Sequence, residues 1–133
     1  MPISNIPIFA MLRTRMQWYQ ERQRVLAENV ANADTPNFRP RDLSPPQFGG
    51  PAPVAAPGLA LTRTSSAHLS GSTGSATQFE SHQRGGQEIR PTGNAVSLED
   101  EMLKVAANQM DYQAATAVYS RSLGLIKTAI GRG

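Results

Sequence analysis

The large apolar residues of this chain gather at its two ends and leave the middle sparse. Between residues 40 and 93 the few that occur stand among Pro, Gly, Ser, Thr and Gln. They are Leu43, Phe48, Val54, Leu59, Leu61, Leu69, Phe79 and Ile89. The chain has 133 residues, enough for one domain, but so sparse a middle cannot bury a conventional core. Ordered structure is therefore expected in the two terminal segments.

The N-terminal segment has the residue spacing of an amphipathic helix. Its large side chains alternate three and four residues apart, which predicts a heptad seam on one face. The predicted seam consists of Phe9, Leu12, Met16, Tyr19, Gln23, Leu26 and Val30. Pro36 pushes Thr35 out of the helical region, so we expect the helix to end near Asn32.

The C-terminal segment predicts a longer helix, from Leu98 to Ile130. Ser97 stands at a capping position, and Asp100 completes the spacing of a capping box. The same three-and-four alternation predicts a second seam. Its members are Leu98, Met102, Val105, Gln109, Tyr112, Thr116, Tyr119, Leu123, Ile126 and Ile130. Gly124 weakens a helix interior, and we expect close packing against another helix to explain it.

The middle segment predicts little regular structure. Seven prolines occur between residues 36 and 57, and a Ser, Gly and Thr stretch covers residues 70–77. Short strands are predicted only weakly, at residues 59–64 and 87–90, with Gly85 and Gly86 as a turn before the second.

These segments together predict an all-α fold. Long N- and C-terminal helices are expected to pair as an α-helical coiled coil, joined by a Pro/Gly/Ser-rich segment that is largely irregular, with at most short β-strands. Residues 1–35 and 94–133 would carry the two helices of the coiled-coil domain. Residues 36–93 would form the extended or flexible middle. Gln23, Gln109 and Thr116 make the seams imperfect, so an isolated subunit is expected to be marginally stable.

No constellation of residues predicts catalysis, a metal site or a cofactor. The chain has no cysteine, and His68 and His82 lack neighbouring ligands at metal-binding spacing. The consecutive carboxylates at residues 99–101 point to different faces of a helix and are explained by the helix dipole. No glycine-rich segment has the strand and helix context of a phosphate-binding loop. The sequence thus predicts no enzyme and no cofactor.

The charge pattern argues against nucleic acid and lipid as partners. The formal net charge is +3, but the arginines of the first helix share it with Glu21 and Glu28 and form no run of consecutive basic residues. Tyr112 and Tyr119 suit helix packing better than base stacking. The N-terminus lacks the features of a secretory signal, and no apolar run is long enough to span a bilayer.

One motif carries more information than the periodicity. Residues 26–39 read LAENVANADTPNFR, an apolar helix end followed by spaced asparagines, Thr-Pro and an aromatic residue. This segment resembles the N-terminal signature of the flagellar axial proteins, which form the rod, the hook and the hook-associated structures. It matches that signature at Asn29, Asn32, Thr35, Pro36 and Phe38. It departs at Asn37, where glycine is usual, although Asn tolerates positive φ and keeps the turn feasible.

Other stretches are similar to the proximal rod subunits of that family. They are residues 93–102, Asn108, residues 112–114, residues 123–130 and residues 64–69. Thr92 departs from the acidic residue usual before Gly93. The resemblance implies a structural subunit of the basal-body proximal rod that polymerises helically into the drive shaft between the motor base and the distal rod and hook.

The resemblance also implies a location and partners. The subunit would be exported by the flagellar type III apparatus without a cleaved signal peptide and would assemble in the periplasm. Its partners would be other rod subunits, a rod-base adaptor protein, and MS-ring or export-gate proteins. The assembly candidates are Leu12, Met16, Tyr19, Leu26, Asn29, Asn32, Thr35, Pro36, Phe38, Met102, Val105, Tyr112, Tyr119, Leu123 and Ile126.

Two alternatives remain open from the residues alone. A soluble helical adaptor or regulator would use the same apolar stripes to bind a single protein partner. A small DNA-binding helical protein would show salt-dependent DNA affinity through arginines of the first helix, Arg13, Arg15, Arg22 and Arg24. Under the rod hypothesis, a charge at Leu26 or Leu123 would enter the seam unpaired and block assembly.

Overall fold

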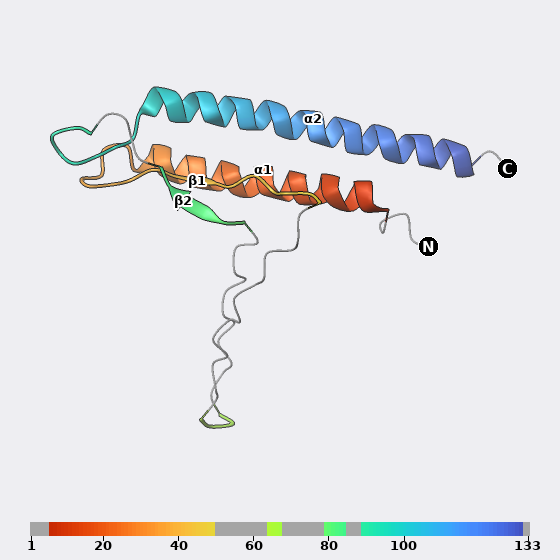
Figure 1. Cartoon of the computed structure of the whole chain (residues 1–133), viewed down its shortest axis with the longest axis horizontal. Helices are drawn as coiled ribbons and strands as arrows, with labels where there is room; N and C mark the ends of the chain where they lie inside the picture. The colour runs from red at the N-terminus through yellow and green to blue at the C-terminus, as the bar shows by residue number, and fades with distance from the viewer. Residues whose placement is uncertain (1–5, 50–63, 68–78, 85–88, 132–133) are drawn as a thin grey trace.

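The computed structural model describes residues 6–49, 64–67, 79–84 and 89–131. Its elements, in chain order, are α1 (Pro7–Ala31), β1 (Arg41–Leu43), β2 (Ser81–Gln83) and α2 (Leu98–Ile130). The two helices lie side by side along the long axis of the molecule, β1 lies against α1, and β2 pairs with β1 (Figure 1). The fold is thus mostly helical, with the two predicted helices and one short two-stranded sheet.

The two helices run antiparallel. At one end of the pair the rings of Phe9 and Tyr119 meet edge to face, with centroids 5.6 Å apart. At the other end Asn29 Nδ2 donates to Glu101 Oε2 at 2.8 Å. Residues near the start of α1 therefore lie beside residues near the end of α2, which also brings the two chain termini to the same end (Figure 1).

Both helices have the predicted boundaries, but the capping of α2 differs from the prediction. Helix α1 ends at Ala31, one residue before Asn32. Ser97 occupies the N-cap position of α2 but makes no side-chain cap hydrogen bond, so the predicted capping box is wrong. The segment that leads into α2 is instead anchored by the buried residues Ala95 and Val96, and their packing fixes the direction in which the helix starts.

The main apolar core lies between α1 and the strands. Trp18 and Val25 of α1 pack with Leu43 of β1 and Phe79, and Tyr19 joins this cluster at its edge. The Trp18 Nε1–H donates to the Ser44 carbonyl oxygen at 2.7 Å, so the indole is satisfied as well as buried. Strand β1 pairs antiparallel with β2, with Asp42 opposite His82.

Neither observed strand was predicted, and neither predicted strand is seen in the described residues. Residues 59–63 and 87–88 lie outside the described part of the chain, while Thr64, Ile89 and Arg90 are not in strands. The turn expected at residues 85–86 and the stretch at residues 70–77 also lie outside it. Three-residue strands carry no periodicity of their own, and β1 and β2 exist because α1 holds β1.

The face that α2 turns toward α1 is rotated from the predicted seam. We call this face the inner stripe; it consists of Glu101, Val105, Asn108, Tyr112, Ala115, Tyr119, Ser122 and Ile126, all buried or half-buried. At every second position of the predicted seam from Met102 to Leu123, the residue that faces α1 is the one just before the predicted residue, for example Glu101 in place of Met102. Met102 is 59% exposed, and Leu98, Gln109, Leu123 and Ile130 are exposed as well. The buried face of α2 is rotated because α1 offers hydrogen-bond partners that draw the polar side chains of Glu101 and Asn108 inward.

Candidate assembly interface

The turn after α1 is held by side chains of the signature motif. Asn32 Nδ2 donates to the Glu28 carbonyl oxygen at 2.8 Å, and the Asn32 backbone N–H donates to the same oxygen at 3.1 Å, so Asn32 closes the helix end twice. The Thr35 hydroxyl donates to Asn32 Oδ1 at 3.0 Å. After Pro36 the chain turns sharply at Asn37, whose φ of 59° is the left-handed conformation that Asn tolerates. The motif therefore ends the helix and redirects the chain, as the sequence predicts.

The segment that enters α2 locks onto this turn. Asn94 is buried, and its Nδ2 donates to the carbonyl oxygens of Asn32 at 3.0 Å and Thr35 at 2.7 Å. Gly93 adopts a φ of 79°, and a Cβ at that position would collide with the side chain of Asn37. A residue other than glycine would therefore separate the two segments.

Asn29 joins three elements at once. Its Oδ1 accepts the Arg41 backbone N–H at 2.9 Å, and its Nδ2 donates to the Arg41 carbonyl oxygen at 2.6 Å and to Glu101 at 2.8 Å. The other oxygen of Glu101 accepts from Lys104. We call Asn29, Asn32 and Asn94 the asparagine clasp, because together they tie α1 to β1 and to the start of α2.

A buried ion pair fastens β1 to α1. Arg22 donates from Nε and Nη2 to the two Asp42 oxygens at 2.9 and 3.0 Å, and the Leu43 N–H adds a third hydrogen bond at 2.8 Å. Burial raises the pKa of Asp42, but the hydrogen bonds from Arg22 and Leu43 outweigh it and hold that pKa below its ordinary value. The Arg22 guanidinium also lies over the Trp18 ring, 5.2 Å from its centroid.

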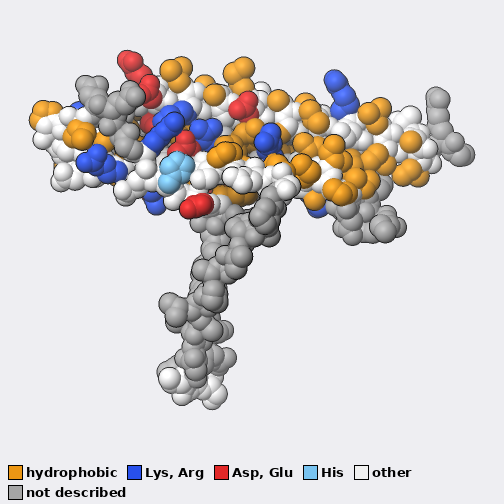
Figure 2. Space-filling model, in the orientation of Figure 1, with side chains coloured by type: hydrophobic (Ala, Val, Ile, Leu, Met, Phe, Trp, Pro, Cys, Tyr) orange, Lys and Arg blue, Asp and Glu red, His pale blue; other side chains and the backbone are white. Residues whose placement is uncertain are grey.

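The outward face of α2 is apolar. We call this face the outer stripe; it consists of Leu103, Met110, Val118 and Leu125, which are between 52% and 70% exposed. Spacings of seven and eight residues keep these side chains on one side of a helix, about a third of a turn from the inner stripe. Figure 2 shows hydrophobic side chains along α2 and at the end of the pair where the termini lie. Contiguous exposed apolar surface of this kind marks a site of protein contact.

The structure divides the predicted assembly residues into three groups. Leu12, Met16 and Leu26 are buried or half-buried on α1, and the Tyr19 carbonyl oxygen accepts a hydrogen bond from Asn108 of α2; Val105, Tyr112, Tyr119 and Ile126 belong to the inner stripe. Asn29, Asn32, Thr35, Pro36 and Phe38 lie at or beside the turn. Met102 and Leu123 stand on the exposed flank of α2.

Sequence reasoning missed the buried polar residues that organise the site. Asn94, Glu101 and Asn108 are each almost fully buried and are spaced by seven residues. This heptad repeat of polar residues was the available signal, and the search for large apolar residues passed over it.

Two kinds of structure are absent from the residues that the structure describes. Neither helix there has a stretch that is both long and apolar enough to cross a membrane. Within the same residues, no three His, Asp or Glu side chains come together in a way that could hold a metal ion.

Comparison with known proteins gives a consistent result. Residues 11–39 match the family described as Flagella basal body rod protein. The flagellar basal body rod protein FlgB of Agrobacterium fabrum (strain C58) is 33% identical over 109 residues, covering 80% of this chain and 80% of that protein. FlgB of Salmonella typhimurium (strain LT2) is 32% identical over 109 residues, covering 77% and 78%. FlgB of Bacillus subtilis (strain 168) is 27% identical over 112 residues, covering 84% of each chain.

Proposed function

The chain belongs to the FlgB family of flagellar basal body rod proteins, and from this premise we propose how its two helices share the building of a rod. It is a structural subunit of the basal body rod and not an enzyme. Helix α1, β1 and the asparagine clasp hold the subunit together. The outer stripe of α2 docks against neighbouring rod subunits.

The mode of assembly follows from the asymmetry of the subunit. The outer stripe lies on α2, and α1 has no comparable stripe among its described residues. A stripe that paired with itself would close a two-fold dimer, so a rod requires the stripe to meet a different surface on the next subunit. Such heterologous contacts propagate as a helix when the rotation does not close a ring. In the rod, residues 1–35 and 94–133 form the axial coiled-coil domain, and residues 36–93 form the middle segment that connects its helices.

The place of the subunit is the proximal rod, in the periplasmic part of the basal body. There it helps to form the drive shaft between the motor base and the distal rod and hook. The proposed partners are other rod subunits, a rod-base adaptor protein, and MS-ring or export-gate proteins, and delivery is by the flagellar type III export apparatus. Support comes from family membership and from the signature turn at Asn29, Asn32 and Thr35.

The outer stripe is the single observation that carries this proposal. Fully burying a large apolar side chain contributes roughly 1.5–3 kcal/mol, and four such side chains stand open on one face. Among the described elements α2 contacts only α1, so that gain is not realised within the subunit. Docking of a neighbour would realise it.

A double charge substitution on the outer stripe tests the proposal. Leu103→Glu with Met110→Glu should leave the helix content of the purified subunit unchanged, because both side chains are 70% exposed. In cells it should abolish swimming and remove the protein from purified basal bodies, since two charges would be buried without partners. Gln113→Glu, an exposed polar position on the same helix, serves as the matched control and should assemble normally.

Quantitative mass spectrometry of basal bodies decides the outcome. Normal copy number and normal swimming in the double variant would show that the outer stripe is not an assembly surface. Retention of the double variant in a soluble complex with a single other protein would favour an adaptor role instead.

A further inference from the structure

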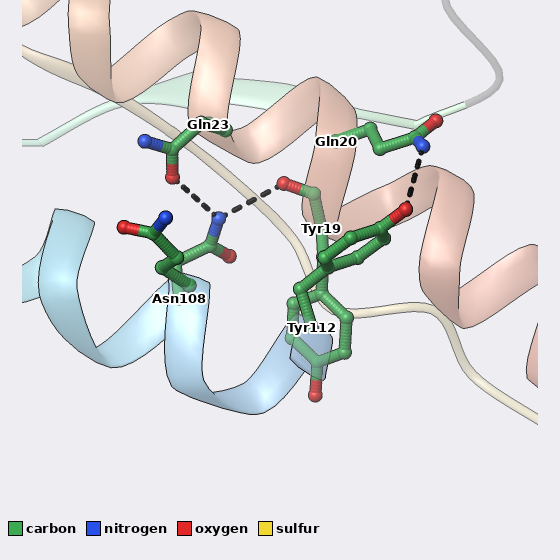
Figure 3. Close-up of a pocket in the computed structure, with 6 residues that line it drawn as sticks. Tyr19, Gln20, Gln23, Asn108 and Tyr112 are labelled. Carbon is green, nitrogen blue, oxygen red and sulfur yellow. Dashed lines mark hydrogen bonds between the residues drawn. The ribbon is translucent and has the colours of Figure 1, made fainter. Parts of the chain in front are cut away.

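The middle of the helix pair is tied together by hydrogen bonds within the subunit. Asn108 Nδ2 donates to the Tyr19 carbonyl oxygen and to Gln23 Oε1, both at 2.9 Å (Figure 3). Beside them Gln20 Nε2 donates to the Tyr112 hydroxyl at 3.1 Å (Figure 3). These donors are used between α1 and α2, whereas both ends of the pair leave charged and apolar side chains open.

The two ends of the pair carry opposite charge. We call residues 6–16 and 116–131 the tail end and residues 28–39 and 89–104 the head end, because the antiparallel pairing brings each set together. The tail end has no acidic residue and four basic ones: Arg13, Arg15, Arg121 and Lys127. The head end has three basic residues, Arg39, Arg90 and Lys104, and five acidic ones: Glu28, Asp34, Glu99, Asp100 and Glu101. The formal charges are therefore +4 at the tail and −2 at the head.

Part of this charge is not used inside the subunit. Arg121 and Lys127 of the tail end are exposed, and so are Glu99 and Asp100 of the head end. None of the four forms an ion pair with any residue that the structure describes. Opposite charges on two surfaces draw those surfaces together and disfavour the contact of like with like.

The tail end protrudes. From the contact of Phe9 with Tyr119, α1 continues for only two residues to Pro7, whereas α2 continues for eleven to Ile130. Helix α2 therefore extends beyond the start of α1 by roughly 13 Å (Figure 1). The exposed apolar side chains at this end include Leu125 of the outer stripe. The others are Ile6, Ile8, Met11, Leu123 and Ile130.

The head end is blunt and hollowed. Helix α2 starts there beside the end of α1, since Glu101 meets Asn29. A hollow of about 430 Å³ is lined by Arg90, Val96, Ser97, Leu98 and Glu99. Two large apolar side chains, Ile89 and Leu98, are exposed at this end. The head end thus offers a recess, apolar side chains and acids, and the tail end offers a protrusion, apolar side chains and bases.

We propose that the tail end of this subunit docks on the head end of the next subunit along the rod. Arg121 and Lys127 lie beside the acids of that head end, and the protruding apolar side chains pack against its recess. The inference rests on the proposed function, because the rod supplies the neighbour, whose head end is built like the one described here. It adds an axial contact to that of the outer stripe, and it orients all subunits the same way because like ends repel.

An anionic lipid surface would also attract a basic and apolar helix end. Lipid, however, matches only the tail end. The head end of the same chain carries the three complementary features, namely the exposed acids, the exposed apolar side chains and the hollow. That match favours a protein neighbour.

Removing the two unpaired cations of the tail end tests the proposal. Copies of Arg121→Gln with Lys127→Gln per basal body should fall about fivefold, because two exposed ion pairs are lost from the contact. Arg121→Lys with Lys127→Arg keeps both charges and should assemble normally. All four substitutions are at exposed positions, so the purified variants should keep the helix content of the original chain.

The same loss of charge away from both ends is the matched control. Arg24→Gln with Arg84→Gln removes two exposed arginines that lie outside the tail and head ends. This variant should assemble normally. An equal fall in both Gln variants would mean that only net charge matters, and the inference would be overturned.

The outcomes separate this inference from the proposed function. If Arg121→Gln with Lys127→Gln assembles normally while the Leu103 and Met110 double variant fails, the axial contact is overturned but the proposed function stands. If both assemble normally, both fail.

A cross-link identifies the neighbour directly. Photoreactive p-benzoylphenylalanine at position 130, irradiated in intact basal bodies, should attach to a rod-protein peptide with Asp or Glu within one turn of the attachment point. Where the neighbour is a second copy, that peptide should lie within residues 89–104. Attachment to lipid, or to a peptide without an acidic residue at that distance, would overturn the proposal.

Discussion

The two helices of this subunit use their side chains in opposite ways. Helix α1 buries its large apolar residues inside the subunit: Phe9, Trp18, Val25 and Leu26. Helix α2 buries polar and small residues there: Glu101, Asn108 and Ala115. Val105, Tyr112, Tyr119 and Ile126 of the inner stripe are half-buried, but the other large apolar residues of α2 are exposed, most of all those of the outer stripe. The comparison supports the proposal that α1 folds the subunit, whereas α2 divides its surface between the subunit and its neighbours.

The difference has a structural cause. Helix α1 is packed on two sides, by α2 and by β1, whereas α2 meets only α1 among the described elements. An apolar stripe on α1 therefore finds cover within one chain. The equivalent residues of α2 have no cover among the described elements, and under the proposed function a neighbouring subunit covers them.

The largest effect is expected from placing the same charged residue at a buried leucine of α1 and, for comparison, at an exposed leucine of α2. Leu26 is 0% exposed, so Leu26→Asp should lower the free energy of unfolding of the isolated subunit by roughly 4 kcal/mol or more. Leu103→Asp should change it by less than about 0.5 kcal/mol, since that side chain is exposed. Urea unfolding followed by circular dichroism measures both.

Leu123→Asp refines this comparison. The sequence placed Leu123 in the seam, but it is 37% exposed on the flank of α2. We expect a small loss of subunit stability together with failed assembly. Loss of stability as large as that of Leu26→Asp would contradict the assignment of Leu123 to the flank.

The asparagine clasp should give the next largest effect. Asn29→Ala removes hydrogen bonds to Arg41 and Glu101 and leaves their buried groups unpaired, which should cost about 2–3 kcal/mol. Asn32→Ala, at a half-buried position, should cost only about 1 kcal/mol. Urea unfolding measures both variants. Equal losses of unfolding free energy would contradict the idea that Asn29 contributes more than Asn32 by joining three elements.

Acid should weaken the packing of β1 on α1. The pKa of Asp42 is lower in the folded state than in the unfolded state. Its ionised carboxylate therefore stabilises the fold above the unfolded-state pKa, and this stabilisation is lost as the pH falls through the folded-state pKa. We expect the stability that this group contributes to fall as the pH drops below the ordinary carboxyl pKa of about 3.8. Asp42→Asn should be less stable at neutral pH and should show a shallower acid dependence.

The smallest effect is expected at Gly124. A Cβ there would meet nothing within 4 Å, so the helix packing predicted from the sequence is not found among the described residues. Gly124→Ala should stabilise the isolated subunit by about 1 kcal/mol, measured by thermal unfolding. Reduced copy number of this variant in basal bodies would place Gly124 at a close contact between subunits; unchanged copy number would leave it without such a role.

The helix boundaries could be predicted from sequence, whereas the buried face of α2 could not. The ends of α1 and α2 depend on local signals, such as Pro36 after the signature asparagines. The orientation of α2 depends on hydrogen-bond partners supplied by Asn29 and Tyr19, residues far away along the chain. Periodicity selected the large apolar residues, and on α2 many of these lie on faces that the subunit leaves uncovered.

The local structure of the signature motif was predicted from the sequence, but its contact with the segment before α2 was not. Its helix stop and its turn at Asn37 were predicted. The engagement of Asn94 with that turn joins residues about 60 positions apart, which no local pattern encodes. Strand β1 was missed for the same reason, since Trp18 and Asn29 hold it from another element.

Methionine oxidation tests the division of labour between the helices most directly, without any substitution. Met110 of the outer stripe is 70% exposed in the subunit, whereas Met16 of α1 is half-buried, seven residues from both Phe9 and Gln23, which contact α2. With dilute peroxide, Met110 of the free subunit should oxidise much faster than Met16, because reaction follows exposure. In intact basal bodies the Met110 rate should fall to that of Met16. A Met110 rate that is the same in free subunits and in basal bodies would contradict the assignment of the outer stripe to assembly.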